Sequence, residues 1–459
     1  MRNSESVKRI NLKLVDIQKA NSLKRIQKLG PSSKRTLAYP LSLTSRKKDS
    51  EVALVYCSER KTHKSRRTLS DGVFDLESRK VAKKPLNHLE VIKVFPKILS
   101  SYEKTEISNY SKIYYLGKQN KVNPELGFDD LECYYRVVKG DHIAYRYEVV
   151  CILGKGCFGE VVKAFDHKKG EYLAIKILRN TETSQVQGLV EVNILRDLRE
   201  NSGAKSNVVK LKKHFKFRSH LCLCFELLDI SLYEFLKKKS VKSISTVKKV
   251  GYQILKGLEE IHNMGVIHCD LKPENVMLNR SLEVKIIDLG TSCYFNSNYF
   301  TYIQSRFYRA PEVILGLSYS RPIDMWSFGC VLAEILTGRP LFPGENEFDQ
   351  LSCIMQLLKP PPGYILKNSL RKHLFFEGNK LRVQRNSRGQ IRLPGSSSLE
   401  RHLKTTDLGF LDLLSKCFEW DPGKRITAKE ALKHKFFKQR VPSKKPRRLF
   451  RHKSMLFFS

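Results

Sequence analysis

The stretch His268-Cys269-Asp270-Leu271-Lys272-Pro273-Glu274-Asn275 constrains the fold more than any other part of the sequence, and Asp288-Leu289-Gly290 follows it after the apolar segment 284–287. The first stretch has the form H-x-D-x-x-x-x-N. Asp270 is suited to accept a proton from a hydroxyl group, and Lys272 to neutralise negative charge beside it. The amide of Asn275 and the carboxylate of Asp288 offer the oxygen ligands that a hard divalent cation prefers. The pattern predicts a catalytic site that binds a metal.

A glycine-rich turn lies upstream of this stretch, between two apolar strands that we expect from Tyr145 to Leu153 and from Val161 to Phe165. It has the form G-x-G-x-x-G-x-V and consists of Gly154, Lys155, Gly156, Cys157, Phe158, Gly159, Glu160 and Val161. Its glycines let backbone amides approach phosphate groups that side chains would block. A plain glycine hairpin would explain the same residues, and no helix follows at once as a dinucleotide-binding fold requires.

A third strand, expected from Tyr172 to Leu178, carries Lys176 in the sequence Leu-Ala-Ile-Lys. A lysine buried beside phosphates would supply positive charge, and Glu191 on the helix that follows could hold it in an ion pair. The alternative is a solvated lysine, since the chain has 84 Lys and Arg residues.

The motifs occur in one order along the chain, and Ala310-Pro-Glu312, an Asp324-Met-Trp-Ser-Phe-Gly run and Arg425 follow them. This order resembles the signature of eukaryotic protein kinases. The resemblance implies an α+β, bilobal kinase domain over 147–437, with a small antiparallel-sheet N-lobe (147–228) and a mainly helical C-lobe (229–437). ATP and Mg²⁺ are the cofactors it implies, and Arg425 is expected to pair with Glu312.

The stretch from Tyr302 to Gly316, YIQSRFYRAPEVILG, is similar to the activation segment of the dual-specificity tyrosine-phosphorylation-regulated kinases, the DYRK family. Cys269 stands where most kinases have arginine, as in that family. Upstream, residues 101–117 resemble the autophosphorylation accessory region of the class II members, and residues 141–147 resemble the segment that leads into their kinase domain. The resemblance covers about residues 88–437. Leu289 and Phe300 depart from the family, which usually has phenylalanine and tyrosine there.

The resemblance also implies contacts and substrates. Phe225 would be the gatekeeper, backbone groups of Glu226 and Leu228 would bond adenine, and Leu153 and Leu227 would complete the nucleotide site. Substrates would be Ser or Thr hydroxyls of proteins, followed by Pro and preceded by basic residues. The enzyme would also phosphorylate its own Tyr302, which would give it dual specificity.

Because Cys269 carries no positive charge, another cation must bind a phosphate on Tyr302. Arg306 and Arg309 lie 4 and 7 residues beyond it, close enough for a curled segment to form a clamp of charge-assisted hydrogen bonds. The alternative is that Tyr302 only packs beside Phe307.

Periodicity and composition divide the rest of the chain. Apolar residues at Val247, Val250, Ile254, Leu258 and Ile261 predict a helix, and Val186 to Leu198 predicts another. Val91, Val94, Ile98 and Tyr102 also recur at helical spacing and open the predicted accessory region, 88–146. We expect a mostly disordered basic tail over 1–87, a second basic tail over 438–459, and a surface insertion over 359–404.

The formal charge of +38 favours acidic partners of any kind, so a basic nucleic-acid-binding or scaffold protein is the alternative to an active kinase. No aromatic-interleaved basic module accompanies the charge, which makes nucleic acid an unlikely main partner. Eleven scattered Cys without a paired framework and the absence of a long apolar run indicate a soluble intracellular protein that does not bind membranes. We also expect a monomer. Basic clusters at 60–67 and 444–448 are compatible with a cytoplasmic or nuclear location.

Overall fold

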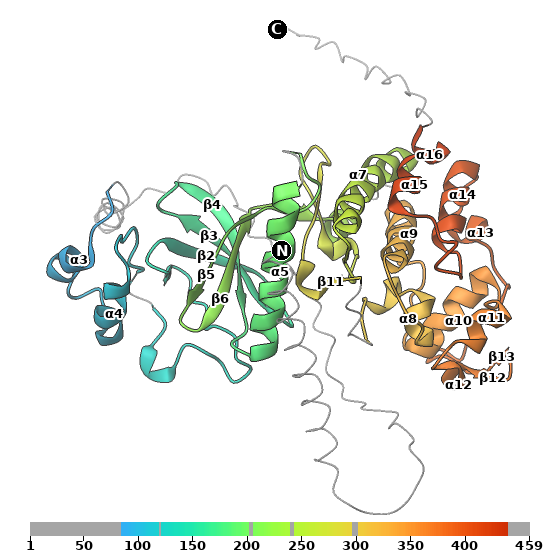
Figure 1. Cartoon of the computed structure of the whole chain (residues 1–459), viewed down its shortest axis with the longest axis horizontal. Coiled ribbons are helices and arrows are strands. Elements are labelled where there is room, and N and C mark those ends of the chain that lie inside the picture. Colours follow the sequence, from blue (N-terminus) through green and yellow to red (C-terminus); the bar gives the residue numbers. More distant parts are fainter. Residues whose placement is uncertain (1–83, 119–120, 202–204, 239–242, 296–301, 439–459) are drawn as a thin grey trace, which may run out of the picture.

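The computed structural model describes residues 84–118, 121–201, 205–238, 243–295 and 302–438. These residues form a sheet-containing lobe, a helical lobe, and a smaller accessory segment at the outer end of the sheet (Figure 1). The predicted bilobal α+β fold is confirmed. The predictions for residues 1–83, for residues 439–459 and for Phe300 concern parts of the chain outside these described ranges. No helix in the described ranges is both long enough and apolar enough to cross a bilayer.

The first lobe is a six-stranded antiparallel sheet in the order β1-β2-β3-β4-β6-β5. Its strands are β1 His142–Ile143, β2 Tyr147–Gly156, β3 Gly159–Asp166, β4 Glu171–Leu178, β5 Leu211–Phe217 and β6 His220–Glu226. β2 and β3 pair as a hairpin whose last partners are Gly156 and Gly159, which confirms the predicted glycine-linked hairpin. The helix α5 (Glu182–Asn201) lies beside this sheet, on the side that faces the second lobe (Figure 1).

The second lobe is mainly helical. Its helices are α6 Leu232–Lys238, α7 Ile244–Asn263, α8 Pro311–Leu315, α9 Pro322–Thr337, α10 Glu347–Leu358, α11 Gly363–Lys367, α12 Lys372–Phe375, α13 Leu399–Leu403, α14 Leu408–Cys417, α15 Ala428–Leu432 and α16 Lys435–Lys438. Short strands connect them: β7 Ile230–Ser231, β8 Val266–Ile267, β9 Val276–Leu278, β10 Val284–Ile286, β11 Cys293–Tyr294, β12 Phe376–Glu377 and β13 Lys380–Leu381. The 3₁₀ turns of this lobe are η3 Pro273–Asn275, η4 Leu289–Thr291 and η5 Arg306–Tyr308.

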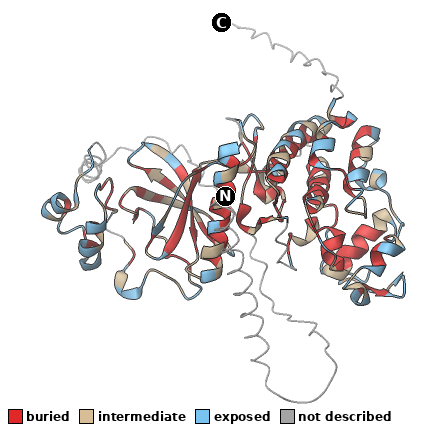
Figure 2. Ribbon diagram, in the orientation of Figure 1, coloured by how far each residue is buried: buried red, intermediate tan, exposed pale blue. Residues whose placement is uncertain are grey.

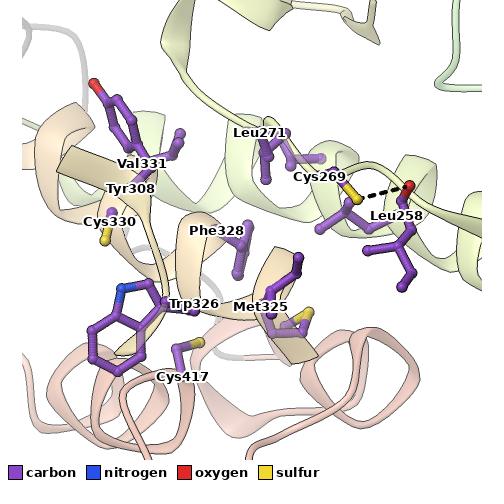
Figure 3. Packing of buried hydrophobic residues seen from close by; sticks show 14 of the residues in the cluster. Leu258, Cys269, Leu271, Tyr308, Met325, Trp326, Phe328, Cys330, Val331 and Cys417 are labelled. Carbon is purple, nitrogen blue, oxygen red and sulfur yellow. Dashed lines mark hydrogen bonds between the residues drawn. The ribbon is translucent and has the colours of Figure 1, made fainter. Parts of the chain in front are cut away.

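Two central helices, α7 and α9, build the core of this lobe. The five apolar positions that predicted α7 are all fully buried, as expected for one face of an amphipathic helix. On α9, Trp326 lies 5.9 Å from the ring of Phe342 and 5.1 Å from that of Phe418, measured between ring centres. Figure 3 shows Met325, Trp326 and Phe328 of this helix among buried residues of neighbouring segments, and Figure 2 shows that buried residues fill the lobe between exposed helix faces. Arg425 pairs with Glu312 at 2.6 Å, which confirms that prediction.

The accessory segment begins with two short helices, α3 (His88–Val94) and α4 (Ser101–Glu106), with the 3₁₀ turns η1 (Ile107–Asn109) and η2 (Pro124–Leu126) after them. The helical spacing of Val94, Ile98 and Tyr102 falls on these two short helices and the break between them, and because the three residues are 59%, 41% and 43% exposed it does not mark a continuous buried face. The chain breaks between the helices, and a capping box starts each one.

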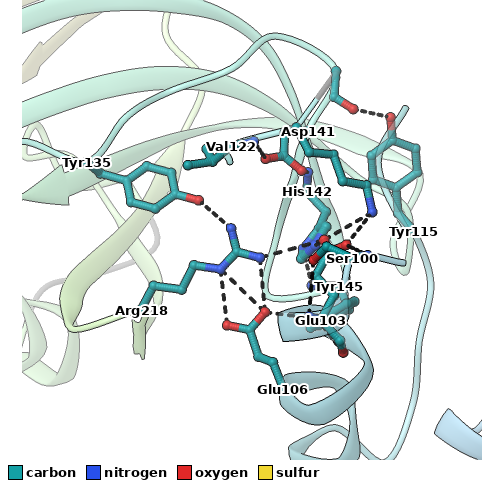
Figure 4. A network of polar contacts seen from close by, with 12 residues as sticks. Ser100, Glu103, Glu106, Tyr115, Val122, Tyr135, Asp141, His142, Tyr145 and Arg218 are labelled. Carbon is teal, nitrogen blue, oxygen red and sulfur yellow. Dashed lines mark hydrogen bonds and ion pairs between the residues drawn. The ribbon is translucent and has the colours of Figure 1, made fainter. Parts of the chain in front are cut away.

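A set of buried charges joins the accessory segment to the sheet. We call Glu103, Glu106, Lys121, His142 and Arg218 the accessory network (Figure 4). Glu103 contacts His142 at 2.7 Å and Lys121 at 2.9 Å, and Arg218 contacts Glu106 at 3.0 Å. Arg218 stands in the β5–β6 turn at φ 45°, so a left-handed backbone aims its side chain at α4. Sequence periodicity carries no signal for this junction.

The predicted surface insertion, 359–404, contains α11, α12, α13 and the β12–β13 hairpin, and most of its side chains are exposed. It is nevertheless anchored beside α8. Arg371 donates to the carbonyl oxygen of Ile314 at 3.0 Å and pairs with Glu347 at 2.6 Å. The insertion therefore supports the end of the segment that carries Tyr302.

Candidate active site

Lys176, Glu191 and Asp288 form one cluster, here called the catalytic cluster, between the two lobes. β4 carries Lys176, α5 carries Glu191, and Asp288 follows β10. The ammonium nitrogen of Lys176 lies 2.9 Å from Glu191 Oε2 and 2.8 Å from Asp288 Oδ1. Burial alone would lower the pKa of Lys176, but the two carboxylates outweigh it and raise that pKa above its ordinary value. The lysine is therefore a fixed cation.

Asp288 stays ionised in this position. Burial would raise its pKa, but the adjacent Lys176 ammonium outweighs burial and lowers the pKa to about 2. Its backbone is left-handed, at φ 61°, which turns the carboxylate toward Lys176. Leu289, the residue that departs from the family pattern, is 1% exposed and belongs to the main core. The apolar side chain thus anchors the metal-ligand candidate beside it.

The catalytic loop holds Asp270 in a polar setting of its own. Lys272 Nζ donates to Asp270 Oδ2 at 2.7 Å, and the backbone N–H of Ser305 donates to Oδ1 at 2.9 Å. Lys272 also donates to the Ser305 hydroxyl at 3.0 Å. The amide nitrogen of Asn275 donates to the carbonyl oxygen of Asp270 at 2.8 Å. One carboxylate thus joins the catalytic loop to the activation segment.

A buried carboxylate of α9 fixes the backbone of this loop by hydrogen bonds. Asp324, with no exposed surface, accepts hydrogen bonds from the backbone N–H groups of His268 and Cys269 at 2.8 and 3.0 Å. Cys269 is in the left-handed region at φ 66°, a strained conformation for a non-glycine residue. Its side chain is fully buried and its Sγ lies 3.6 Å from that of Cys293. Position 269 therefore supplies no cation to the activation segment, in line with the sequence argument.

The glycine-rich turn forms the tip of the β2–β3 hairpin. Gly159 cannot carry a side chain, because a Cβ there would lie 2.2 Å from the carbonyl oxygen of Ile177. Phe225 is 8% exposed on β6, and Glu226 ends that strand just before Leu228. The nucleotide-contact assignments stay predictions for Leu153, Gly154, Lys155, Gly156, Cys157, Phe158, Gly159, Glu160, Val161, Phe225, Glu226, Leu227 and Leu228.

Tyr302 lies on the surface of the activation segment, with 68% of it exposed. The guanidinium carbon of Arg309 lies 4.1 Å from the centre of its ring. Arg309 also donates to the carbonyl oxygens of Ile303 and Gln304. Arg306 instead donates to backbone carbonyls of the loop before α10, including that of Glu345 at 2.6 Å. The structure thus brings one member of the predicted clamp to Tyr302 and directs the other elsewhere.

A family model described as protein kinase domain matches residues 147–437. The chain is 44% identical over 415 residues to dual specificity tyrosine-phosphorylation-regulated kinase 4 of Homo sapiens, with 87% of this chain and 80% of the relative covered. The chain belongs to the DYRK family of protein kinases.

Other DYRK relatives are longer. Dual specificity tyrosine-phosphorylation-regulated kinase 2 of Drosophila melanogaster is 44% identical over 376 residues, which cover 78% of this chain and 52% of that protein. The match therefore spans about half the length of the fly relative. Kinase 3 of Homo sapiens is 42% identical over 388 residues, which cover 78% of this chain and 66% of the relative. The predicted resemblance to the DYRK family is confirmed.

The protein kinase domain implies the use of ATP and a divalent metal ion. The chemistry of the ligand atoms fits such an ion, because Asp288 stays ionised and the amide nitrogen of Asn275 already donates a hydrogen bond to the carbonyl oxygen of Asp270. That bond leaves the amide oxygen of Asn275 as its metal-ligand atom. The buried ammonium of Lys176 fits the charge of a nucleotide phosphate.

Sequence reasoning gave no role to two polar residues beside Asp270 in this DYRK site. Ser305 lies inside the quoted activation segment, but only the fold shows that it contacts Asp270 and Lys272. Glu274 lies inside the catalytic-loop motif, and its buried Oε2 atom has no hydrogen-bond partner among the described residues. The motif spacing located both residues without indicating what they touch.

Proposed function

We propose that this DYRK-family kinase is catalytically active and, with Mg²⁺, transfers the γ-phosphoryl group of ATP to Ser and Thr hydroxyls of proteins. The observation that carries the proposal is the catalytic cluster: Lys176 contacts Glu191 and Asp288 at the same time, at 2.9 and 2.8 Å. Protein kinases need this lysine–glutamate pair and the metal-binding aspartate in place together. An inactive scaffold has no need to keep these charges assembled.

In the proposed reaction, the substrate oxygen forms a bond to the γ-phosphorus while the bond from that phosphorus to its bridging oxygen breaks. Asp270 accepts the proton of the substrate hydroxyl. Lys272, 2.7 Å from Asp270, stabilises negative charge on the oxygens in transfer. Ser305 orients the Asp270 carboxylate through its backbone N–H. Asn275 and Asp288 hold the metal ion, which supplies positive charge beside the phosphates.

The activity is tested with purified full chain, Mg²⁺, ATP and a generic acceptor protein. We expect Asp270→Asn to reduce phosphoryl transfer by about 10² to 10⁴-fold, since it removes the proton acceptor. Asp412→Asn makes the same chemical change at a partly exposed carboxylate of α14, which contacts Lys416, His434 and Lys435, and it should retain wild-type turnover. A wild type without transfer would favour the basic scaffold protein instead.

We further propose that Tyr302 is phosphorylated by the kinase itself, which would give the chain dual specificity. Its exposed ring and the adjacent Arg309 guanidinium support this, because a phosphate on the ring would lie beside a cation already in place and would compete for it with Glu347, which pairs with Arg309 at 3.0 Å. Arg306 could join only after it leaves the carbonyl of Glu345.

This self-modification is tested by expression of the wild type and Asp270→Asn in a bacterial host without tyrosine kinases. Mass spectrometry should find phosphate on Tyr302 in the wild type and none in the variant. An active wild type with unmodified Tyr302 would refute the mechanism.

We propose in addition that the preferred Ser or Thr acceptor is followed by Pro and has basic residues upstream of it. Glu274 supports the basic preference, because burial raises its pKa and its Oε2 atom has no partner among the described residues. A substrate cation would satisfy it. Glu274→Gln should lower kcat/KM about tenfold for an arginine-containing peptide and leave its alanine counterpart unchanged. Equal effects on the two peptides would exclude this role.

We also propose a monomer that occurs in the cytoplasm, the nucleus or both. The basic clusters at 60–67 and 444–448 support nuclear import, as runs that import machinery could bind. Removal of both clusters should lower the nuclear fraction of the fluorescently tagged chain. An unchanged fraction would show that they are inert.

A further inference from the structure

The accessory segment also contacts the glycine-rich turn, through the hairpin-like stretch 128–136. Asp129 and Tyr135 form an antiparallel bridge, and the backbone N–H of Arg136 donates to the carbonyl oxygen of Phe128 at 2.8 Å. Inside the turn, Asp130 Oδ1 accepts the backbone N–H of Tyr134 at 2.9 Å. These bonds fix Tyr134, which is 7% exposed, at the edge of the sheet beside the β2–β3 tip.

Three successive carbonyl oxygens of the glycine-rich turn accept hydrogen bonds from outside the turn. The Tyr134 hydroxyl donates to the carbonyl of Gly156 at 2.9 Å. The Arg179 guanidinium donates to that of Cys157 at 3.3 Å, and the Arg179 backbone N–H donates to that of Phe158 at 2.9 Å. The accessory stretch also orients Arg179, because its Nε donates to the carbonyl oxygen of Glu132 at 2.8 Å.

Cations reinforce the same contact. Lys155 Nζ lies 3.7 Å from the centre of the Tyr134 ring, and the guanidinium carbon of Arg179 lies 4.8 Å from it. Lys155 also pairs with Asp130 at 3.4 Å. The aromatic ring thus attracts one cation from the glycine-rich turn and one from the strand end behind it.

The direction of these bonds matters for nucleotide binding. A trans peptide places its C=O and N–H on opposite sides of the chain. Hydrogen bonds from Tyr134 and Arg179 hold the carbonyl oxygens of Gly156, Cys157 and Phe158. The N–H groups of the same peptides, those of residues 157 to 159, therefore point the opposite way, away from these donors. Backbone N–H groups of such a turn are the ones that bind phosphate oxygens.

We propose that Tyr134 is a positioning residue for ATP, which holds the glycine-rich turn with its N–H groups toward the phosphates. The accessory segment then contributes to nucleotide affinity as well as to the stability of the first lobe. The inference rests on the proposed kinase activity only in its kinetic readout, since nucleotide binding is measurable without turnover.

Tyr134→Phe removes the donor to Gly156 and keeps the ring that Lys155 contacts. Loss of one net hydrogen bond should raise the Kd for methylanthraniloyl-ADP with Mg²⁺, and KM for ATP, about three- to tenfold, while kcat and the peptide KM stay within about twofold. Amide exchange of residues 157–159 should become faster. Arg179→Lys, which retains the charge but lacks the fork, should shift both constants in the same direction.

Tyr115→Phe is the matched control, because the Tyr115 hydroxyl donates to the carbonyl oxygen of Gly140 at 2.8 Å within the accessory segment. It loses the same kind of bond away from the glycine-rich turn and should leave nucleotide binding unchanged. Wild-type affinity in Tyr134→Phe, or an equal loss in Tyr115→Phe, would overturn the inference. A wild type that binds no methylanthraniloyl-ADP would also overturn it, whereas a wild type that binds this nucleotide but transfers no phosphate would refute only the proposed kinase activity.

Discussion

The accessory network and the catalytic cluster each bring opposite charges into contact, but they differ in how open those charges are. Side chains of Glu103 and Arg218 are 2% and 1% exposed. In the catalytic cluster, the side chains of Lys176 and Glu191 are also buried, at 11% and 2% exposed, but the side chain of Asp288 is 40% exposed and opens the cluster to solvent. A closed ion pair can only hold two segments together, whereas an open one can exchange its partner for a ligand. The contrast separates charges that stabilise the fold from charges that act on substrate.

The largest expected effect comes from the open cluster. Asp288→Asn should reduce phosphoryl transfer by about 10²-fold or more, because it removes a metal ligand and the charge that faces Lys176. The melting temperature should change by only a few degrees, since the side chain is partly exposed. Steady-state kinetics and thermal denaturation measure the two effects. Turnover equal to the wild type would remove Asp288 from the site.

The closed network should respond in the opposite way. Arg218→Met leaves Glu103 and Glu106 buried without their shared cation, and we expect the free energy of unfolding to fall by about 3–5 kcal/mol. Lys212→Met is the matched control, because Lys212 pairs with Glu171 at 2.8 Å where both side chains are more exposed. That change should lower stability by no more than about 1 kcal/mol. Equal losses in denaturant titrations would contradict the distinction.

The pH dependence of the closed network gives a smaller effect. Burial would raise the pKa of Glu103, but the hydrogen bond and charge of His142 and the charge of Lys121 outweigh it and lower the pKa to about 2. A carboxyl whose folded pKa is depressed stabilises the fold above its unfolded pKa, and this contribution is lost as pH falls through about 2. The shift from 4.5 corresponds to about 3 kcal/mol at neutral pH.

Glu103→Gln should therefore be less stable than the wild type at pH 7, and the difference should shrink between pH 4.5 and 2. Urea titrations of the two proteins across that range measure it. A difference that stays constant with pH would mean that Glu103 acts through packing and not through its charge.

Sequence predicted the catalytic side of this comparison far better than the accessory side. Motif spacing located Asp270, Asn275 and Asp288, because the chemistry of the site restricts which residue types can stand there. The steps of 3 and 4 between apolar residues predicted α7, because one face of that helix is fully buried. Local pattern is informative where a long element or a reacting group imposes it.

The accessory side lacks such constraints. Val94 and Tyr102 fall at helical spacing, but the helices there are too short to bury a continuous face. Arg218 is one of 84 basic residues, and its partner Glu106 lies 112 positions away. Arg218 differs from most other basic residues that the structure describes in its left-handed backbone conformation, and the spacing of apolar residues in a sequence does not reveal the backbone angle of one arginine.

The placement of the accessory network along the chain also sets an order of assembly during synthesis. Its members all lie between Glu103 and Arg218, so every one of them has been made before Asp270 is added. At about 5–20 residues per second, the ribosome takes roughly 3 to 10 s to proceed from Arg218 to Asp270. All residues of the accessory network are thus available to pair on the nascent chain before the catalytic loop exists, so that the second lobe can fold onto a first lobe whose charged contacts have already formed.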